Sequence, residues 1–441
     1  MLDNRPKNTA YDNRRPKIIY GSCLGKSVTV RYDRRTFLRA AAGTVGLGSL
    51  AGCVGTFGTE SGEPVRFGAM LPVSGSLEQV GTHGKRAAEQ AVEDINRAGG
   101  VLGRPVELTT VDTEGSASVA TDGYASLADA GVIGFVGGLV SDVSLALAPK
   151  AADDAVMEMS PASTNPRLSD AGRADGRKFF GRTVPSDSLQ ATAMAKILDA
   201  TQYADADRVA LLTVDGAFGS DLGTALGDQL DAEVVTEVSY DPSAEEFGGV
   251  VDEVFADSPD AVGFVSVPGQ ERGVLDAYGA SDHEAPWVFS AGLFDGEIPP
   301  YYEGFYSASL SSVRTDGYFH LTQRLSDIAP LQPYAANAYD ALFLMATAAE
   351  YAGEASGPAI ADALQAVSGG TGHTVSVGEF DRVRTLVDAG RELNYQGASS
   401  GVDLTEALEP LSSYLVERVH NGSVEQVELL QRQFFESGGS Q

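Results

Sequence analysis

The three residue types of a serine hydrolase triad occur in order near the end of the sequence. Gly397-Ala398-Ser399-Ser400-Gly401 matches the G-x-S-x-G pattern in which a sharp turn exposes a nucleophilic serine, and Asp403 and His420 follow it. That turn needs a helix directly after the serine, yet a single residue separates Gly401 from Asp403 and the apolar Val402-Asp403-Leu404 follows at once. We therefore predict that the chain is not an enzyme and that a serine-directed fluorophosphonate leaves it unlabelled.

Metal and phosphate chemistry also lack their usual patterns. The only cysteines are Cys23 and Cys53, which excludes a thiolate cluster, and we expect no disulfide. Gly84-Lys85-Arg86 lacks the upstream glycine and the following Ser or Thr of a phosphate-binding loop. The histidines show no metal-ligand spacing: His83, His283, His320, His373 and His420. We expect neither a metal nor a cofactor.

Hydroxyl side chains follow two consecutive predicted strands. The apolar strand 132–136 is followed by Gly137-Gly138-Leu139-Val140-Ser141, where a helix is expected to begin. Free backbone N–H groups and the Ser141 hydroxyl at such a junction would bind an anion. Ser160–Thr164 follow the next strand and would add the Thr164 hydroxyl and the Ala162 backbone. The alternative interpretation is that these Ser and Thr residues only cap helices.

Strands and helices alternate through the body of the chain, which predicts βαβ units on parallel sheets. The first series contains strands at 65–71, 106–111, 132–136 and 155–159, with helices at 84–98, 119–127 and 144–152. The second contains strands at 180–184, 209–214, 234–240 and 261–267, with helices at 189–200, 220–230 and 271–278 and one after a capping box at Ser243–Glu246. The sequence therefore predicts two α/β sheets, one formed by each series.

A long helix and a hairpin are expected late in the chain. Apolar residues recur at helical spacing through 333–351. Two apolar strands, 413–419 and 424–430, flank Asn421-Gly422, which is a strong signal for a two-residue turn. Asn421-Gly422-Ser423 is also an N-glycosylation sequon, so the segment is a turn alone or a turn that carries a glycan.

Residues 1–52 are predicted to be a twin-arginine export signal. Arg34 and Arg35 precede an apolar run, 40–50, that is too short to span ~30 Å of hydrocarbon. Leu50-Ala51-Gly52-Cys53 is similar to a lipobox, in which Cys53 is lipidated and becomes the mature N-terminus, and residues 53–63 would form a flexible tether. The alternative, a buried helix, is disfavoured by three glycines in the run.

Charge is the unusual property of the composition. Asp and Glu number 61 against 31 Lys and Arg, for a net charge of −30. This charge argues against nucleic acid or an anionic membrane face as a partner. Beyond residue 53 the lysines are Lys85, Lys150, Lys178 and Lys196. Dispersed carboxylates with few lysines predict a halophilic protein, because such a surface stays hydrated in molar salt; a mesophilic acidic protein is the alternative.

From about residue 64 to 430 the chain resembles the substrate-binding lipoproteins of ABC importers in the leucine/isoleucine/valine-binding group. The resemblance implies the periplasmic binding protein type I fold, with two lobes that close on one small ligand. It also implies an ABC permease and ATPase as partners, a lipid anchor in the membrane and a monomeric protein. The segments that carry it are Gly68-Ala69-Met70 with Ser74-Gly75, Ala91–Asn96 before Gly99-Gly100, Ser160–Pro166, and Tyr395–Ser399 before Val402-Asp403.

The implied lobes are two doubly wound αβα layers joined by three hinge crossings, near Arg182, Tyr306 and Tyr395. Lobe one would take 64–182 and 307–394. Lobe two would take 183–306 and 395–432, and residues 433–441 would be a tail. The ligand would be captured by hinge closure and delivered to the membrane permease.

The family's ligand-binding positions fall on Ser141, Ala162 and Thr164 in lobe one, which would hold the ligand's carboxylate and part of its amine. In lobe two, Phe218 keeps an aromatic side chain, but Val267 stands where tyrosine is common. The acidic residue expected to bind the amine would fall at 291–293, where there is none, and Asp295 is the nearest substitute. We therefore expect a branched-chain or other amino acid, an amide, or an amine-free carboxylate, bound by a transport protein or by a surface sensor of the same fold.

Overall fold

The computed structural model describes residues 62–436, apart from 268, 291–297 and 312–313. All described elements belong to one compact unit, residues 60–441. The predicted export signal with Arg34 and Arg35, the lipidation site Cys53 and the proposed ligand residue Asp295 lie outside the described residues.

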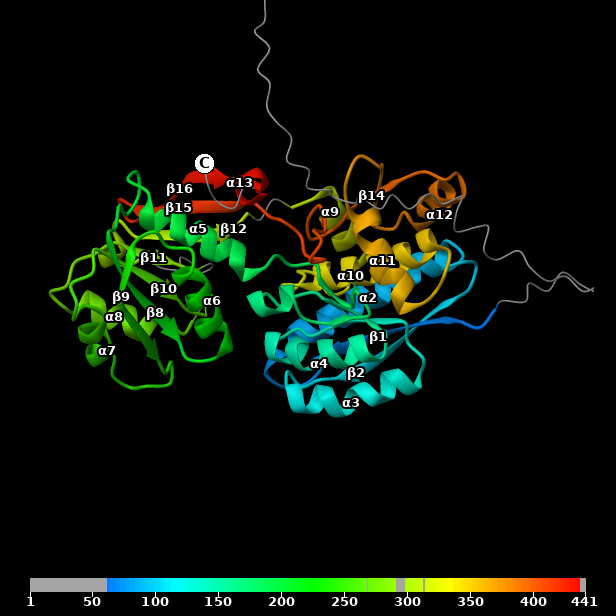
Figure 1. Cartoon of the computed structure of the whole chain (residues 1–441), viewed down its shortest axis with the longest axis horizontal. Helices are drawn as coiled ribbons and strands as arrows, with labels where there is room; N and C mark the ends of the chain where they lie inside the picture. Colours follow the sequence, from blue (N-terminus) through cyan, green and yellow to red (C-terminus); the bar gives the residue numbers. More distant parts are fainter. Residues whose placement is uncertain (1–61, 268, 291–297, 312–313, 437–441) are drawn as a thin grey trace, which may run out of the picture. The chain divides into compact units, whose positions relative to one another are not determined.

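A parallel sheet is formed by the four strands of the first predicted series (Figure 1). It also contains β7, which was expected to open the second series but pairs with β4 instead. Its strand order is β2-β1-β3-β4-β7. Crossovers of this kind place helices on both faces. Its strands are β1 (Val65–Leu71), β2 (Val106–Asp112), β3 (Gly134–Gly137), β4 (Met157–Ser160) and β7 (Phe180–Arg182).

Helices cover both faces of this sheet. On one face β1, β3 and β4 pack against α2 (Glu78–Arg97), α10 (Ala335–Ala352) and α11 (Gly357–Ser368) in the largest apolar core of the described chain. On the other face lie α3 (Ala117–Asp129) and α4 (Ser141–Asp153). The remaining elements on this sheet's side are β5 (Arg173–Ala174), β6 (Arg177–Lys178), α9 (Asp316–Arg324), β13 (His373–Ser376), α12 (Phe380–Asp388) and β14 (Leu393–Gln396).

The second sheet is mixed, with strand order β16-β15-β12-β11-β10-β8-β9. The strands from β9 to β12 are parallel, and β15 and β16 join as an antiparallel hairpin. Asn421 and Gly422 have φ of 52° and 71° at its turn, as the Asn-Gly signal predicts. The strands are β8 (Arg208–Val214), β9 (Glu233–Tyr240), β10 (Ala261–Val265), β11 (Trp287–Phe289), β12 (Tyr306–Leu310), β15 (Tyr414–His420) and β16 (Ser423–Leu430).

This sheet also lies between two helical layers. On one face pack α5 (Asp187–Asp199), α6 (Ala217–Gly227) and α13 (Arg432–Glu436); on the other pack α7 (Gly248–Val254) and α8 (Arg272–Gly279). We call the first sheet with its helices lobe 1 and the second with its helices lobe 2. The predicted fold class, two doubly wound αβα lobes, is confirmed.

The passages of the chain between the two sheets lie after Arg182, after Leu310 and after Leu408. Strand β12 pairs with β11 and β15 in lobe 2. Residues from Tyr395 to Leu408 bury apolar side chains in the core of lobe 1. The second and third passages thus come later in the chain than the expected crossings near Tyr306 and Tyr395.

Two local predictions are wrong. Helix α2 begins at Glu78, six residues before the expected Gly84. Gly81 lies inside the helix because the Pro72 backbone packs against it, and a Cβ there would overlap the Pro72 carbonyl oxygen. The expected capping box at Ser243–Glu246 does not form. Instead Asp241 accepts hydrogen bonds from the Ser243 amide (2.8 Å) and hydroxyl (2.7 Å), and α7 begins after Phe247 without a side-chain cap.

Candidate functional site

The start of α4 offers unpaired backbone donors at the carboxyl end of β3. Gly138, at φ 61°, turns the chain directly after the strand, and α4 begins at Ser141 without a side-chain cap. The amides of Val143 and Ser144 donate to the Val140 carbonyl. Among the described residues, the amides of Ser141 and Asp142 have no acceptor. Together with the helix dipole, they form a site suited to an anion.

A buried cluster of serines fixes this junction to the loop after β4. The Gly138 carbonyl accepts hydrogen bonds from the hydroxyls of Ser160 (2.6 Å) and Ser163 (2.8 Å). Ser144 Oγ lies 2.9 Å from Ser163 Oγ. Glu158 is fully buried in β4, and burial raises the pKa of its carboxyl group well above the usual value.

The loop after β4 carries the other two predicted residues of lobe 1. The amide of Ala162 donates to Ser160 Oγ (3.3 Å). Its carbonyl accepts no hydrogen bond from the residues that the structure describes, and a carbonyl suits an amine. Thr164 is half-buried, and its side chain lies near that of Asp187, whose pKa it lowers. The amide of Asp187 donates to the Thr164 carbonyl (2.9 Å). Because β3 and β4 are parallel neighbours, Ser141, Ala162 and Thr164 lie at one edge of the first sheet.

Sequence reasoning missed Asp187, the first residue of α5. Its side chain is 6% exposed. Burial raises its pKa to about 6, against the lowering effects of the Thr164 side chain and the nearby Arg182 charge. In the sequence, Ser186-Asp187 looks like an ordinary helix start, and Ser186 does accept from the Ser188 amide (3.2 Å). The sequence signal that could have identified Asp187 is an acidic residue soon after the passage between the two sheets that follows Arg182.

The predicted residues of lobe 2 follow two neighbouring parallel strands, β8 and β10. Phe218 is half-buried in α6 and packs on the apolar cores of both sheet faces. Val267 follows β10 and is 38% exposed. Asn165, in the loop that carries Thr164, donates its side-chain amide to the Asp221 carboxylate of α6.

Tyr334 is a second residue that the sequence analysis did not single out. It precedes α10, its backbone has φ 66°, and it is 40% exposed. Burial and then the charge of Asp187 raise the pKa of its hydroxyl. A left-handed, half-exposed tyrosine is strained by roughly 1 kcal/mol or more, and such residues concentrate at binding sites. Tyr334 therefore joins the candidate residues as an aromatic group within reach of the Asp187 charge.

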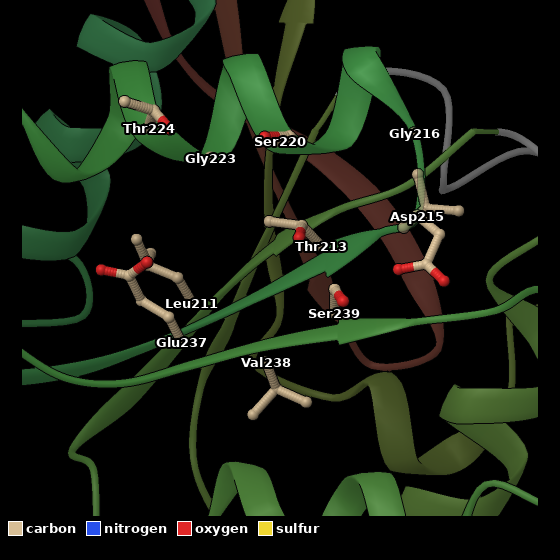
Figure 2. Close-up of a pocket in the computed structure, with 11 residues that line it drawn as sticks. Leu211, Thr213, Asp215, Gly216, Ser220, Gly223, Thr224, Glu237, Val238 and Ser239 are labelled. Carbon is tan, nitrogen blue, oxygen red and sulfur yellow. The ribbon is translucent and has the colours of Figure 1, made fainter.

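A separate cavity of about 320 Å³ lies between α6, β8 and the edge strand β9 (Figure 2). Gly223 brings α6 close to β8, since a Cβ there would lie 2.6 Å from Thr213 Cγ2. The polar residues that line the cavity are Thr213, Asp215, Ser220, Thr224, Glu237 and Ser239. None of the predicted ligand residues lines this cavity.

The residues of the hydrolase pattern are not joined as a triad. The Ser399 hydroxyl donates to Asp340 of α10 (2.6 Å), which also accepts from the amides of Ala398 (2.8 Å) and Ser399 (2.7 Å). His420 Nδ1 lies 2.9 Å from a Glu303 oxygen at the β15–β16 turn. The glycine-rich segment therefore wraps a buried carboxylate and has a structural role.

The comparisons with known proteins agree with this fold. A model of the periplasmic binding protein family matches residues 64–384. The chain is 45% identical over 382 residues to the chemotactic signal transduction system substrate-binding protein BasB of Halobacterium salinarum, a match that covers 86% of this chain and 92% of that protein. It is 28% identical to the Leu/Ile/Val-binding protein BraC3 of Rhizobium johnstonii, over 45% of this chain and 54% of that protein.

A solved structure gives the same result for the fold. The branched-chain amino acid transporter substrate-binding protein LivJ of Streptococcus pneumoniae, in complex with isoleucine, aligns with a TM-score of 0.60 at 19% identity. The alignment covers 84% of this chain and all of that one. Within the described residues, no helix combines the length and apolar character needed to cross a bilayer. The resemblance seen in the sequence is confirmed: this chain belongs to the periplasmic binding protein family.

Proposed function

We propose that this protein captures a small carboxylate, in the first place a branched-chain or related amino acid, between its two lobes outside the cytoplasm. The observation that carries the proposal is the pair of unpaired amides at the start of α4, beside the Thr164–Asp187 contact. The lobes would close on the ligand, which would shift an open–closed equilibrium.

The carboxylate half of the ligand would be bound by lobe 1. The amides at Ser141 and Asp142 and the hydroxyls of Ser141 and Thr164 are donors of the kind that hold an anion at a helix N-terminus. Asp142 is exposed, so its charge is solvated. Phe218, Val267 and Tyr334 would supply apolar contacts to the ligand side chain.

The amine half would be bound by the Ala162 carbonyl and by Asp187. Asp187 takes the role expected of the missing acidic residue at 291–293, and Asp295 stays a second candidate for it. A carboxyl group with a pKa of about 6 is ionised at neutral pH and would pair with an ammonium group. An amide or an amine-free carboxylate is the alternative ligand. Such a ligand would place a neutral group beside Asp187, and the carboxyl group would then bind it in the protonated form.

The membrane partner would be a signal transducer or an ABC permease. The 45% identical relative is a chemotaxis protein by name, which favours a signal transducer as the partner. The sequence resemblance favours an ABC permease with its ATPase. In both cases the protein would be a monomer tethered through lipidated Cys53 after twin-arginine export.

A thermal-shift screen of the purified protein in molar KCl tests the binding proposal, because ligand binding to the native state raises the melting temperature. Leucine, isoleucine and valine are compared with their amides and with amine-free acids such as 4-methylpentanoate. A shift with the amino acids supports the pairing of the amine with Asp187. A shift only with amine-free acids supports the alternative ligand, and no shift with any compound contradicts the proposal.

A deletion strain separates the two partners. Loss of attraction toward the ligand with unchanged uptake identifies a signalling protein. Loss of uptake with unchanged attraction identifies an importer component.

A further inference from the structure

Arg182, the last residue of β7, is fully buried with every side-chain nitrogen in contact with a partner. Its Nη1 donates to the carbonyls of Ser163 (3.1 Å) and Asn165 (2.9 Å). Its Nε donates to a Glu409 carboxylate oxygen (2.9 Å), which Nη2 also contacts. Nη2 donates to Ser169 Oγ as well (3.0 Å).

The two carbonyls held by Arg182 flank Thr164. Fixing both carbonyls holds the backbone on either side of Thr164 and so limits the positions that its side chain can take. The planar guanidinium can bridge several oxygens at fixed angles, which a lysine ammonium cannot reproduce.

The same side chain ties this loop to the last passage between the lobes. The Arg182 amide donates to the Leu408 carbonyl (2.9 Å), and Glu409 directly precedes the segment that leads into β15. Lys178 adds a parallel connection, since its Nζ donates to the carbonyls of Leu168 (3.1 Å) and Ala407 (2.8 Å). Two buried basic side chains of lobe 1, Arg182 and Lys178, therefore hold the loop after β4 and the segment 407–409 together.

We propose that Arg182, with Glu409 and Ser169, is a positioning group that orients the loop of Ala162 and Thr164 for the ligand and couples this loop to the lobe crossing. The inference rests on the proposed function. Arg182 itself does not touch the ligand.

The test is a double-mutant cycle measured by calorimetric titration with leucine in molar KCl. Arg182→Lys keeps the buried charge but loses the bridge. Ser169→Ala removes the hydroxyl that accepts from Arg182 (3.0 Å) and donates to Glu409 (3.0 Å), and it leaves both charged residues in place. We expect Arg182→Lys to weaken leucine binding by about tenfold or more and Ser169→Ala by a smaller factor. Combined with Thr164→Ala, Arg182→Lys should add less than about a further twofold, because both changes act on the same contact.

Hydrogen exchange of the ligand-free protein decides the positioning claim independently of leucine. Arg182→Lys and Ser169→Ala should speed amide exchange in peptides covering 161–169 and leave those of β8 unchanged. The control is Arg177→Lys, which alters an exposed ion pair with Asp362 (2.9 Å) and should change neither binding nor exchange.

The outcomes separate this inference from the proposed function. If the unmodified protein binds leucine, and both variants bind it equally well with unchanged exchange, the positioning role is wrong. Additive losses with Thr164→Ala also contradict it. If the unmodified protein binds none of the screened ligands, the proposed function fails, and the exchange result alone supports or overturns the positioning of the loop.

Discussion

Asp187 shows how a single residue can oppose stability while serving a site. Its carboxyl group is buried beside Thr164 and near Arg182, and burial dominates the shift of its pKa to about 6. A group whose pKa is higher in the folded state than in the unfolded state stabilises the fold least where it is ionised. Such a residue persists where its charge has a use, which is the physical reason for assigning the ligand amine to it.

Asp187→Asn should remove a loss of stability that the unmodified protein suffers as pH rises from acid to neutral. With a pKa of about 6 folded and 3.8 unfolded, the folded state binds more protons between these values. The unmodified protein therefore loses about 2.4 kcal/mol of unfolding free energy as pH rises from 4 to 7. The asparagine variant should lack this loss. Denaturant unfolding in molar KCl at several pH values measures it, with Asp215→Asn, an exposed carboxylate, as the control. If the unfolding free energy depended on pH equally in the unmodified protein and in Asp187→Asn, the pKa of Asp187 would not be raised by folding.

The same group predicts pH-dependent binding. An ammonium ligand pairs with ionised Asp187, so binding releases a proton, and affinity for leucine should rise by about tenfold from pH 5 to pH 7. Affinity for 4-methylpentanoate should stay level or fall. Titrations at both pH values distinguish the ligands, and a leucine affinity that does not change with pH would show that Asp187 is not the amine partner.

At the scale of elements, the sequence predicted those whose signals are local. Strand β1 has the expected bounds, and the Asn-Gly turn forms the expected hairpin. The crossing near Tyr306 was misplaced because β12 is a short strand whose membership of lobe 2 depends on pairing with the distant β15. Strand β14 was missed for the same reason, since among the described strands it pairs with β13 and it packs on α11.

The candidate site divides in the same way. Ser141 and Thr164 could be found because each follows a recognisable strand. Asp187 and Tyr334 could not, because burial and backbone strain depend on the tertiary structure that surrounds them.

The segment 395–399 should stabilise lobe 1 through Asp340 of α10. Asp340 accepts four hydrogen bonds from this segment, those already described and one from the Tyr395 hydroxyl (2.6 Å). Asp340→Ala leaves these donors without their buried acceptor and should lower the unfolding free energy by about 3–5 kcal/mol. Asp362→Ala, at an exposed ion pair, should cost less than about 1 kcal/mol. Equal effects of the two changes would contradict this role.

At the scale of the whole molecule, the net charge of −30 makes the stability of the fold depend on the salt concentration. Repulsion between surface carboxylates should weaken the fold in dilute buffer and be screened in molar salt. We expect the melting temperature to rise by more than about 5 °C, or roughly 2 kcal/mol, between dilute buffer and molar KCl. A scan of the protein over KCl concentration measures this, and a melting temperature independent of salt would argue for an ordinary acidic protein.

The central claim is that the α4 and Thr164 groups of lobe 1 hold the carboxylate of a small ligand. Its most direct test is calorimetric titration of leucine into the unmodified protein and into Ser141→Ala/Thr164→Ala in molar KCl. The control, Ser126→Ala/Thr322→Ala, removes hydroxyls that bond only carbonyls of their own helices. We predict that the site variant loses about 100-fold or more in affinity while its ligand-free melting temperature stays close to that of the control. Unchanged leucine affinity in the site variant would contradict the account.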